Sequence, residues 1–337
     1  NIFKTSIIAV VAVFSLSSCN DALDIIQDGE MPADLTFQTT ADLDKYLNGA
    51  VYASLDNSNE IFLSAQFTDE LGVGPQNSEL QLNAHQFYLD VTNGFAAGIW
   101  LSNYGTINRV NRLLDGAKRI TPSTAEVASY NNIIAQGRLI RAFNYFTLLS
   151  YFSTDMKSSS ALGVMVFDNV PLVDEVKPRV ANSEVFSVID ADIAFAEANL
   201  TSNSNYYRAT RNLLNAFKAR YYLYRGMYPQ AKLAAEAVLS SSGLSLTPAT
   251  PAPSGLAFGN TAHASLNALA TANPYKKLWV DTAQGEIIFA LNRPSTPVNG
   301  WGNIGSLFNT NVSSSSGSTL YDMGRKTYNL LSSVNGD

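Results

Sequence analysis

Apolar residues recur every three or four positions along most of the chain, which is the spacing of an amphipathic α-helix. This period predicts helices over 40–51, 96–118, 123–152 and 183–200. Two further apolar faces, the first aromatic and the second rich in alanine, flank a turn at 225–228 and predict a tight antiparallel helix pair. The pattern therefore indicates an all-α dominated protein with long loops and little strand.

Capping residues mark where these helices are expected to begin. Thr40 and Ser183 each precede a run of helical spacing and are predicted to cap it. Ser123 with Glu126 three positions later is a capping-box signature for the long helix that follows. That helix is apolar on nearly all sides, so we expect it at the centre of the molecule.

Several stretches carry no sustained helical period. Residues 56–94 and 155–178 are interrupted by Gly and Pro and are interpreted as a long loop and a connector. After position 240 the chain is rich in Ser, Thr, Pro and Ala, with at most a short helix over 262–272. The run GEIIFAL at 285–291 predicts one short strand. Long loops on a rigid helical body are common places for binding sites.

The first nineteen residues form a separate signal. Lys4 precedes an apolar run of ten residues at 7–16 and the small residues Ser17 and Ser18, which is the pattern of a signal peptide over 1–18. The run is too short to span a membrane, and Cys19 follows it where a bacterial lipobox places the lipidated cysteine. A mature chain of residues 19–337 would then be anchored by lipid. A general secretory signal with Cys19 near its cleavage site by chance is the alternative.

Composition narrows the function classes. The chain has 22 Lys and Arg against 28 Asp and Glu, a formal net charge of −6, and so offers no basic surface for nucleic acid. A single cysteine excludes an internal disulfide and any zinc site that needs two thiols.

Motifs for catalysis, metal binding or a cofactor are weak. His85 and His263 stand far apart in the sequence, and no GxSxG serine motif occurs. The GxGxxG match at 300–305 lacks the strand and helix that dinucleotide binding requires. The carboxylate pairs at 69–70 and 174–175 do not fix the separation that a glycosidase needs. We therefore predict no catalytic residues, no metal and no cofactor.

Aromatic residues are abundant, with 16 Tyr, 17 Phe and 3 Trp. Those at helical spacing are expected in the core, whereas those in irregular segments are candidate platforms for the apolar face of a sugar ring. The second group contains Phe87, Tyr88, Tyr275, Trp279, Trp301 and Tyr321.

A set of segments in fixed order resembles the SusD/RagB family, the outer-membrane nutrient-binding lipoproteins of Bacteroidetes. The matching segments are Cys19, Asp69 with Glu70, Trp100 with Tyr104, Ile107 and Asn111, GRLIRAFNYF at 137–146, VPLV at 170–173, residues 216–231 and GEIIFAL at 285–291. Together they span nearly the whole chain. The turn Gly226-x-Tyr228-x-x-Ala231 also resembles a tetratricopeptide unit.

The resemblance implies a tetratricopeptide-like helix-turn-helix scaffold (an α/α superhelix). It implies an outer-membrane lipoprotein facing the cell exterior that captures oligosaccharides or peptides without catalysis and passes them to a SusC-like TonB-dependent transporter. Four residues are our candidates for ligand contact: Trp100, Asn103, Trp301 and Tyr321. Members of the family are longer, and the chain opens with Asn rather than Met, so we expect further sequence at both ends.

Two other functions stay open at this point. A surface-anchored glycoside hydrolase would show two buried carboxylates facing each other across a cleft. A non-catalytic adhesin or scaffold would show loops without a concave aromatic cluster.

Overall fold

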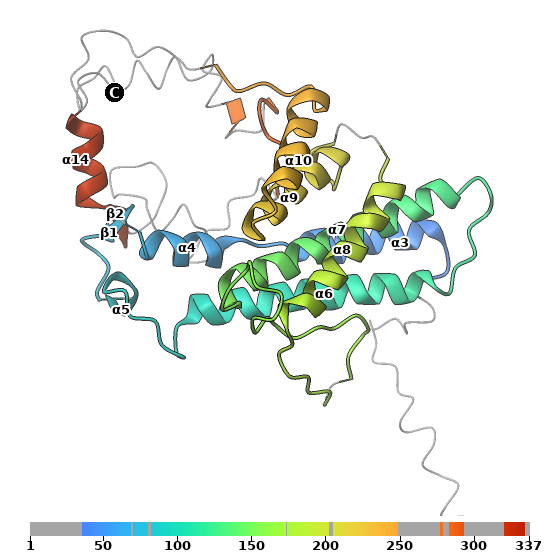
Figure 1. Ribbon diagram of the computed structural model, residues 1–337, viewed down its shortest axis with the longest axis horizontal. Helices are drawn as coiled ribbons and strands as arrows, with labels where there is room; N and C mark the ends of the chain where they lie inside the picture. The colour runs from blue at the N-terminus through green and yellow to red at the C-terminus, as the bar shows by residue number, and fades with distance from the viewer. Residues whose placement is uncertain are drawn as a thin grey trace, which may run out of the picture.

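The computed structural model describes residues 36–68, 70–79, 82–172, 174–201, 205–248, 277–278, 283–292 and 320–333. Within these ranges the chain is mainly helical (Figure 1). The elements are α3 (Thr40–Tyr46), a π-helical turn η1 (Leu47–Val51), a 3₁₀ turn η2 (Tyr52–Ser54), α4 (Ser58–Gln66), β1 (Leu71–Val73), α5 (Leu82–His85), α6 (Gly94–Ala117), α7 (Val127–Phe152), α8 (Asn182–Asn199), α9 (Arg211–Tyr224), α10 (Tyr228–Ser241), β2 (Tyr321–Met323) and α14 (Arg325–Ser333). The helical prediction is confirmed.

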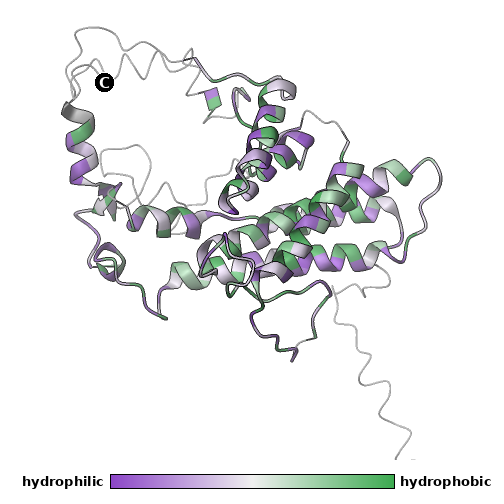
Figure 2. Ribbon diagram, viewed as in Figure 1, coloured by the Kyte–Doolittle hydropathy of each residue, from purple (hydrophilic) through white to green (hydrophobic). Residues whose placement is uncertain are grey.

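Helix α7 lies at the centre, as predicted, with α6 and α8 packed along it (Figure 1). Figure 2 shows hydrophobic residues gathered where these three helices meet. Leu139, Tyr145 and Leu149 of α7 are almost fully buried in a core that also takes side chains from α6, α8 and α9. Burying one such side chain stabilises the fold by about 1.5–3 kcal/mol. A second core joins α3 and η1 to the C-terminal half of α6.

Helices α9 and α10 form the predicted antiparallel pair. Gly226 in the turn between them has φ +73°, a conformation that favours glycine. Pro229 lies in the first turn of α10, where its missing N–H costs nothing. Ala231 and Ala234 are the buried residues of α10, so small side chains let α9 approach closely.

Two predicted caps lie elsewhere than expected. The first helix is capped by Thr39, whose hydroxyl accepts from the Asp42 N–H at 3.3 Å while the Asp42 carboxylate accepts from the Thr39 N–H at 3.1 Å. Thr40 is instead buried inside the helix. Ser183 lies within α8, which begins at Asn182 without a side-chain cap. The predicted capping box is only half formed: the Glu126 carboxylate accepts from the Ser123 N–H at 3.2 Å and from its hydroxyl at 2.6 Å, but α7 begins at Val127 without a side-chain cap.

The structure corrects two element predictions. Residues 56–94 contain α4, β1 and α5 rather than a continuous loop. Residues 285–291 form no strand, because Gly285 has φ +52° and the Ile287 N–H turns back to the Gln284 carbonyl. The two short strands β1 and β2 instead pair antiparallel, with Gly72 opposite Asp322. The predicted helix over 262–272 lies outside the described residues. Among the described helices, none combines the length and hydropathy needed to cross a bilayer.

Candidate functional site

An aromatic cleft opens between α6 and the connector that follows α7. Its volume is about 370 Å³, and we define it by its lining residues: Trp100, Leu101, Tyr104, Gly105, Ile107, Asn108, Met165, Phe167 and Pro171. Pockets of this size and mostly apolar lining are typical of small-molecule sites.

Packing fixes the aromatic walls of the cleft. The Trp100 ring meets Phe152 edge to face at 4.9 Å and Tyr104 at 5.0 Å between centroids. The Tyr104 hydroxyl donates to the Met165 carbonyl at 2.8 Å, and burial raises the pKa of Tyr104 so that this donor stays protonated. Trp100 is half-buried, which leaves part of its indole facing the cleft.

Buried polar groups hold the connector against the helices. The Tyr145 hydroxyl donates to the Phe167 carbonyl at 2.9 Å and accepts from the Phe167 N–H at 2.8 Å. Burial raises the pKa of Tyr145 to about 12. The Asn111 amide donates to the carbonyls of Phe167 and Asn169, each at 2.8 Å. The Phe167 side of the cleft is therefore a rigid wall.

One polar atom in the cleft lacks an internal partner. The Oδ1 of Asn108 is buried and, among the described residues, accepts no hydrogen bond. A buried acceptor without a partner is unfavourable, so a rotation of the Asn108 side chain that brings Oδ1 to a ligand hydroxyl would be favourable.

The sequence candidates do not all meet at this cleft. Asn103 is buried on the α4 side of α6, where its amide donates to Glu60 Oε1 at 3.1 Å and to the Ile99 carbonyl at 2.8 Å. Burial raises the pKa of Glu60. Trp301 and Cys19 lie outside the described residues, so the structure places only part of the candidate set.

Tyr321 is only 3% exposed and belongs to a small core with Phe62 at the β1–β2 end of the molecule. Its hydroxyl accepts from Gln66 Nε2 at 3.0 Å, and the His85 ring lies 5.8 Å from its ring. Burial lowers the pKa of His85. Tyr321 is therefore not part of the aromatic cleft. Nowhere in the described ranges do three His, Cys, Asp or Glu side chains gather as metal ligands.

Of the other aromatic residues in irregular segments, two are described by the structure and two are not. Phe87 and Tyr88 are 64% and 59% exposed on the segment after α5. Tyr275 and Trp279, with His263 and Asp69, lie outside the described residues.

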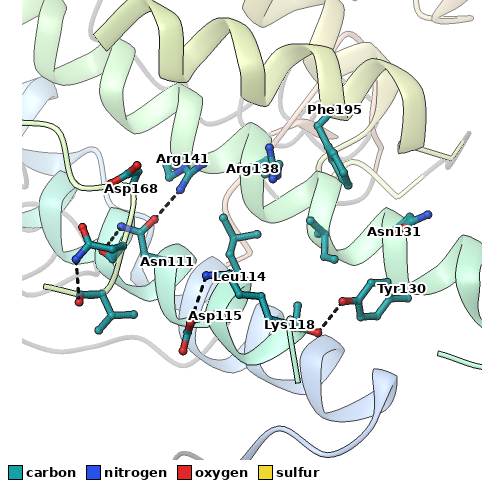
Figure 3. A pocket seen from close by; sticks show the side chains of 14 residues that line it. Asn111, Leu114, Asp115, Lys118, Tyr130, Asn131, Arg138, Arg141, Asp168 and Phe195 are labelled. Atoms are coloured by element: carbon teal, nitrogen blue, oxygen red, sulfur yellow. Dashed lines mark hydrogen bonds and ion pairs between the residues drawn. The ribbon is translucent and has the colours of Figure 1, made fainter. Parts of the chain in front are cut away.

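A second hollow, the polar groove, lies between α6, α7, Phe195 of α8 and residues 168–170 of the connector (Figure 3). Its volume is about 550 Å³. Three parts of the chain line the groove. Helix α6 contributes Asn111, Leu114, Asp115, Ala117 and Lys118, and helix α7 contributes Tyr130, Asn131, Ile134, Arg138 and Arg141. The remaining lining residues are Asp168, Asn169, Val170 and Phe195.

A buried ion-pair cluster lies at the base of the polar groove. Arg141 donates to both carboxylate oxygens of Asp192 at 2.8 Å and, through Nη1, to Asn111 Oδ1 at 2.7 Å. Arg138 lies 3.5 Å from the same carboxylate. Burial raises the pKa of Asp192 and lowers that of Arg138. Such a cluster is favourable only while every charge keeps its partners.

Sequence reasoning missed this groove and half of the aromatic cleft. Trp100 and Tyr104 are four positions apart on a helix, which is a signal for one shared face. The residues that complete the cleft, from Met165 to Pro171, come from a connector with no periodicity. Two arginines three positions apart, in a helix with no other charged residue, were the available signal for the groove.

Comparison with known proteins gives the family. The sequence model of a family described as "Starch-binding associating with outer membrane" matches residues 21–223, more than half of the chain. This chain belongs to the SusD-like family. A curated SusD-like protein of Bacteroides ovatus is 28% identical over 232 residues, which cover 66% of this chain and 40% of that protein.

Solved SusD-like structures share the fold. A SusD superfamily protein from Bacteroides vulgatus aligns over 89% of this chain and 64% of its own, with a TM-score of 0.68 and 18% identity. A SusD-like carbohydrate binding protein from the same species covers 63% of this chain and 47% of its own, with a TM-score of 0.53 and 22% identity. The predicted tetratricopeptide-like helical fold of the SusD family is confirmed. The chain spans about two fifths of the length of its B. ovatus relative.

Proposed function

We propose that this SusD-like chain binds oligosaccharides at the cell surface without catalysis and that the aromatic cleft is a sugar-binding site. The observation that carries the proposal is the half-buried Trp100, held by Phe152 and Tyr104 at the rim of a cleft. The family's starch-binding description and the carbohydrate-binding relative support the ligand class.

The proposed binding is by stacking and hydrogen bonding. The apolar face of a sugar ring would pack on the Trp100 indole, whose position is already fixed, so little side-chain entropy is lost on binding. A hydroxyl of the same sugar would donate to Asn108 Oδ1, which is otherwise unpartnered within the described structure. No group in this arrangement needs to move a proton.

We expect Trp100→Ala to weaken binding of a neutral oligosaccharide by about tenfold or more, because truncating a central aromatic contact costs about 2 kcal/mol. The measurement is calorimetric titration of a panel of neutral oligosaccharides that includes maltoheptaose. Each mixture is then analysed for cleavage products.

Tyr228→Ala is the matched control, because Tyr228 is an exposed aromatic residue at the start of α10, outside the cleft. It should bind the panel as the parent protein does. Unchanged affinity in the Trp100 variant would exclude the aromatic cleft as the site, and cleavage products would favour the glycoside hydrolase alternative.

We also propose that Cys19 carries the lipid that holds the chain at the outer membrane, and that the bound sugar passes to a SusC-like TonB-dependent transporter. The lipobox pattern around Cys19 and the family's outer-membrane description support this placement.

We expect Cys19→Ala to move the protein from the membrane fraction to the soluble fraction after cell lysis, because no lipid can then be attached. Ser17→Ala keeps a small residue before the cysteine and serves as the control that should stay with the membrane. Recovery of the Cys19 variant in the membrane fraction would contradict the anchor.

A further inference from the structure

The ion-pair cluster under the polar groove contains two guanidinium groups and one carboxylate. Arg141 donates to both carboxylate oxygens of Asp192 at 2.8 Å. Arg138 makes one longer contact, 3.5 Å, to Oδ1 of the same carboxylate. The Nε of Arg138 is buried without a hydrogen-bond partner in the described part of the chain. The cluster therefore carries a net charge of +1, because Arg138 and Arg141 share one carboxylate.

The position of this guanidinium is fixed. Its central carbon lies 4.4 Å from the centroid of the Phe195 ring on α8, within the range of a cation–π contact. Its side chain is 31% exposed, and Figure 3 shows it on the wall of the groove next to Phe195. An anion that enters the groove would meet a guanidinium already in place, which reduces the entropic cost of binding.

The neighbouring charges leave the Arg138 end of the groove positive. Asp115 is shared by Lys118 at 3.4 Å and Arg119 at 3.3 Å, so it is already paired with two cations. Asp168 is exposed and lies at the opposite end, beyond Arg141 (Figure 3). This positive end is notable in a chain whose formal net charge is −6.

Uncharged groups in the groove suit a ring with hydroxyls. Leu114, Ile134 and Phe195 supply apolar surface. Asn131 also lines the groove, and its side-chain amide can both donate and accept. A volume of about 550 Å³ lies within the range of small-molecule pockets.

We propose that the polar groove is a second binding site, distinct from the aromatic cleft, which takes a carboxylate-bearing sugar unit such as a uronic acid. Arg138 pairs with the carboxylate, and Asn131 bonds a ring hydroxyl. The choice of a sugar rests on the proposed function, whereas the requirement for an anion rests on the charges of the groove alone.

Binding of tetragalacturonic acid to the whole protein tests the proposal. Arg138→Gln removes the charge and leaves a shorter polar side chain, and it should weaken binding by about tenfold or more, as expected for loss of a charge-assisted hydrogen bond. Arg138→Lys should give an intermediate loss, since the charge remains but the planar fork does not. The fully methyl-esterified oligosaccharide should bind the parent protein at least about tenfold more weakly than the acid.

Arg220→Gln is the control for loss of one positive charge, because Arg220 is exposed on α9, outside both sites. Circular dichroism and maltoheptaose binding report whether the Arg138 variant keeps its fold and the aromatic cleft. Trp100→Ala should leave tetragalacturonic acid binding unchanged, so the failure of one site is separable from the failure of the other.

Four results would overturn the proposal: no binding of the acid by the parent protein, equal binding by Arg138→Gln, equal binding of the ester, or loss of acid binding in Trp100→Ala. If tetraglutamate bound as tightly as tetragalacturonic acid, with the same dependence on Arg138, the groove would be assigned to acidic peptides. That result would also overturn the sugar class.

Discussion

Asp192→Asn is expected to lower the free energy of unfolding by about 3–5 kcal/mol. The carboxylate is 0% exposed and forms the ion pair of Arg141, a buried guanidinium that would lose this partner. Removal of one partner from a buried pair costs more than the pair itself contributes, because the desolvation of the other charge is no longer offset. Urea denaturation followed by circular dichroism measures the change.

Two variants separate this effect from a general loss of negative charge. Glu236→Gln breaks the exposed Lys232–Glu236 contact at 3.6 Å and should change the stability by less than about 1 kcal/mol. Arg141→Met combined with Asp192→Asn should recover part of the loss, because the more deeply buried of the two guanidinium groups is then removed together with its carboxylate. A double variant less stable than Asp192→Asn alone would contradict this explanation.

Tyr221→Ala is expected to lower the free energy of unfolding by about 3–5 kcal/mol, the range for emptying a large aromatic site in a core. Its ring is 0% exposed and stacks on Phe217 with centroids 5.9 Å apart. Its hydroxyl donates to Asp190 on α8 at 2.9 Å and accepts from Arg225 at 2.9 Å. One side chain therefore joins α9 to α8 by both packing and hydrogen bonds.

Tyr228→Ala provides the matched control, because Tyr228 lies at the start of α10 and is 57% exposed. It should change the urea midpoint little. Equal midpoints for the two tyrosine variants would show that the α9–α10 pair does not depend on its contact with α8.

The long helices were predictable from the sequence, whereas the short elements were not. Helices α6 and α7 run for 24 and 26 residues, so their apolar period repeats many times. Helix α4 has nine residues, and its apolar positions Ile61, Phe62 and Leu63 are consecutive. Its burial against α6 is a tertiary effect that no local period reports. The run at 285–291 is apolar, as a buried strand would be. Phe289 and Leu291 nevertheless pack against the second core without forming a strand.

The candidate site was predictable only in part for a similar reason. Trp100 could be selected because tryptophan is rare in this chain and the resemblance includes it. Its neighbours in the cleft, Met165 and Phe167, lie more than sixty positions away and are placed by hydrogen bonds from Tyr104 and Tyr145. Asn103 lies three positions after Trp100 on the same helix, but its side chain turns toward α4, where Glu60 accepts its hydrogen bond. Only tertiary structure separates these two residues.

The connector after α7 contributes to both hollows. Met165, Phe167 and Pro171 face the aromatic cleft, whereas Asp168, Asn169 and Val170 face the polar groove. The same amide, that of Asn111, binds the backbone at Phe167 and at Asn169. One thin partition of polypeptide therefore separates the two hollows. A substitution that shifts the backbone of this partition is expected to alter both hollows, so their ligand preferences would change together during evolution or engineering.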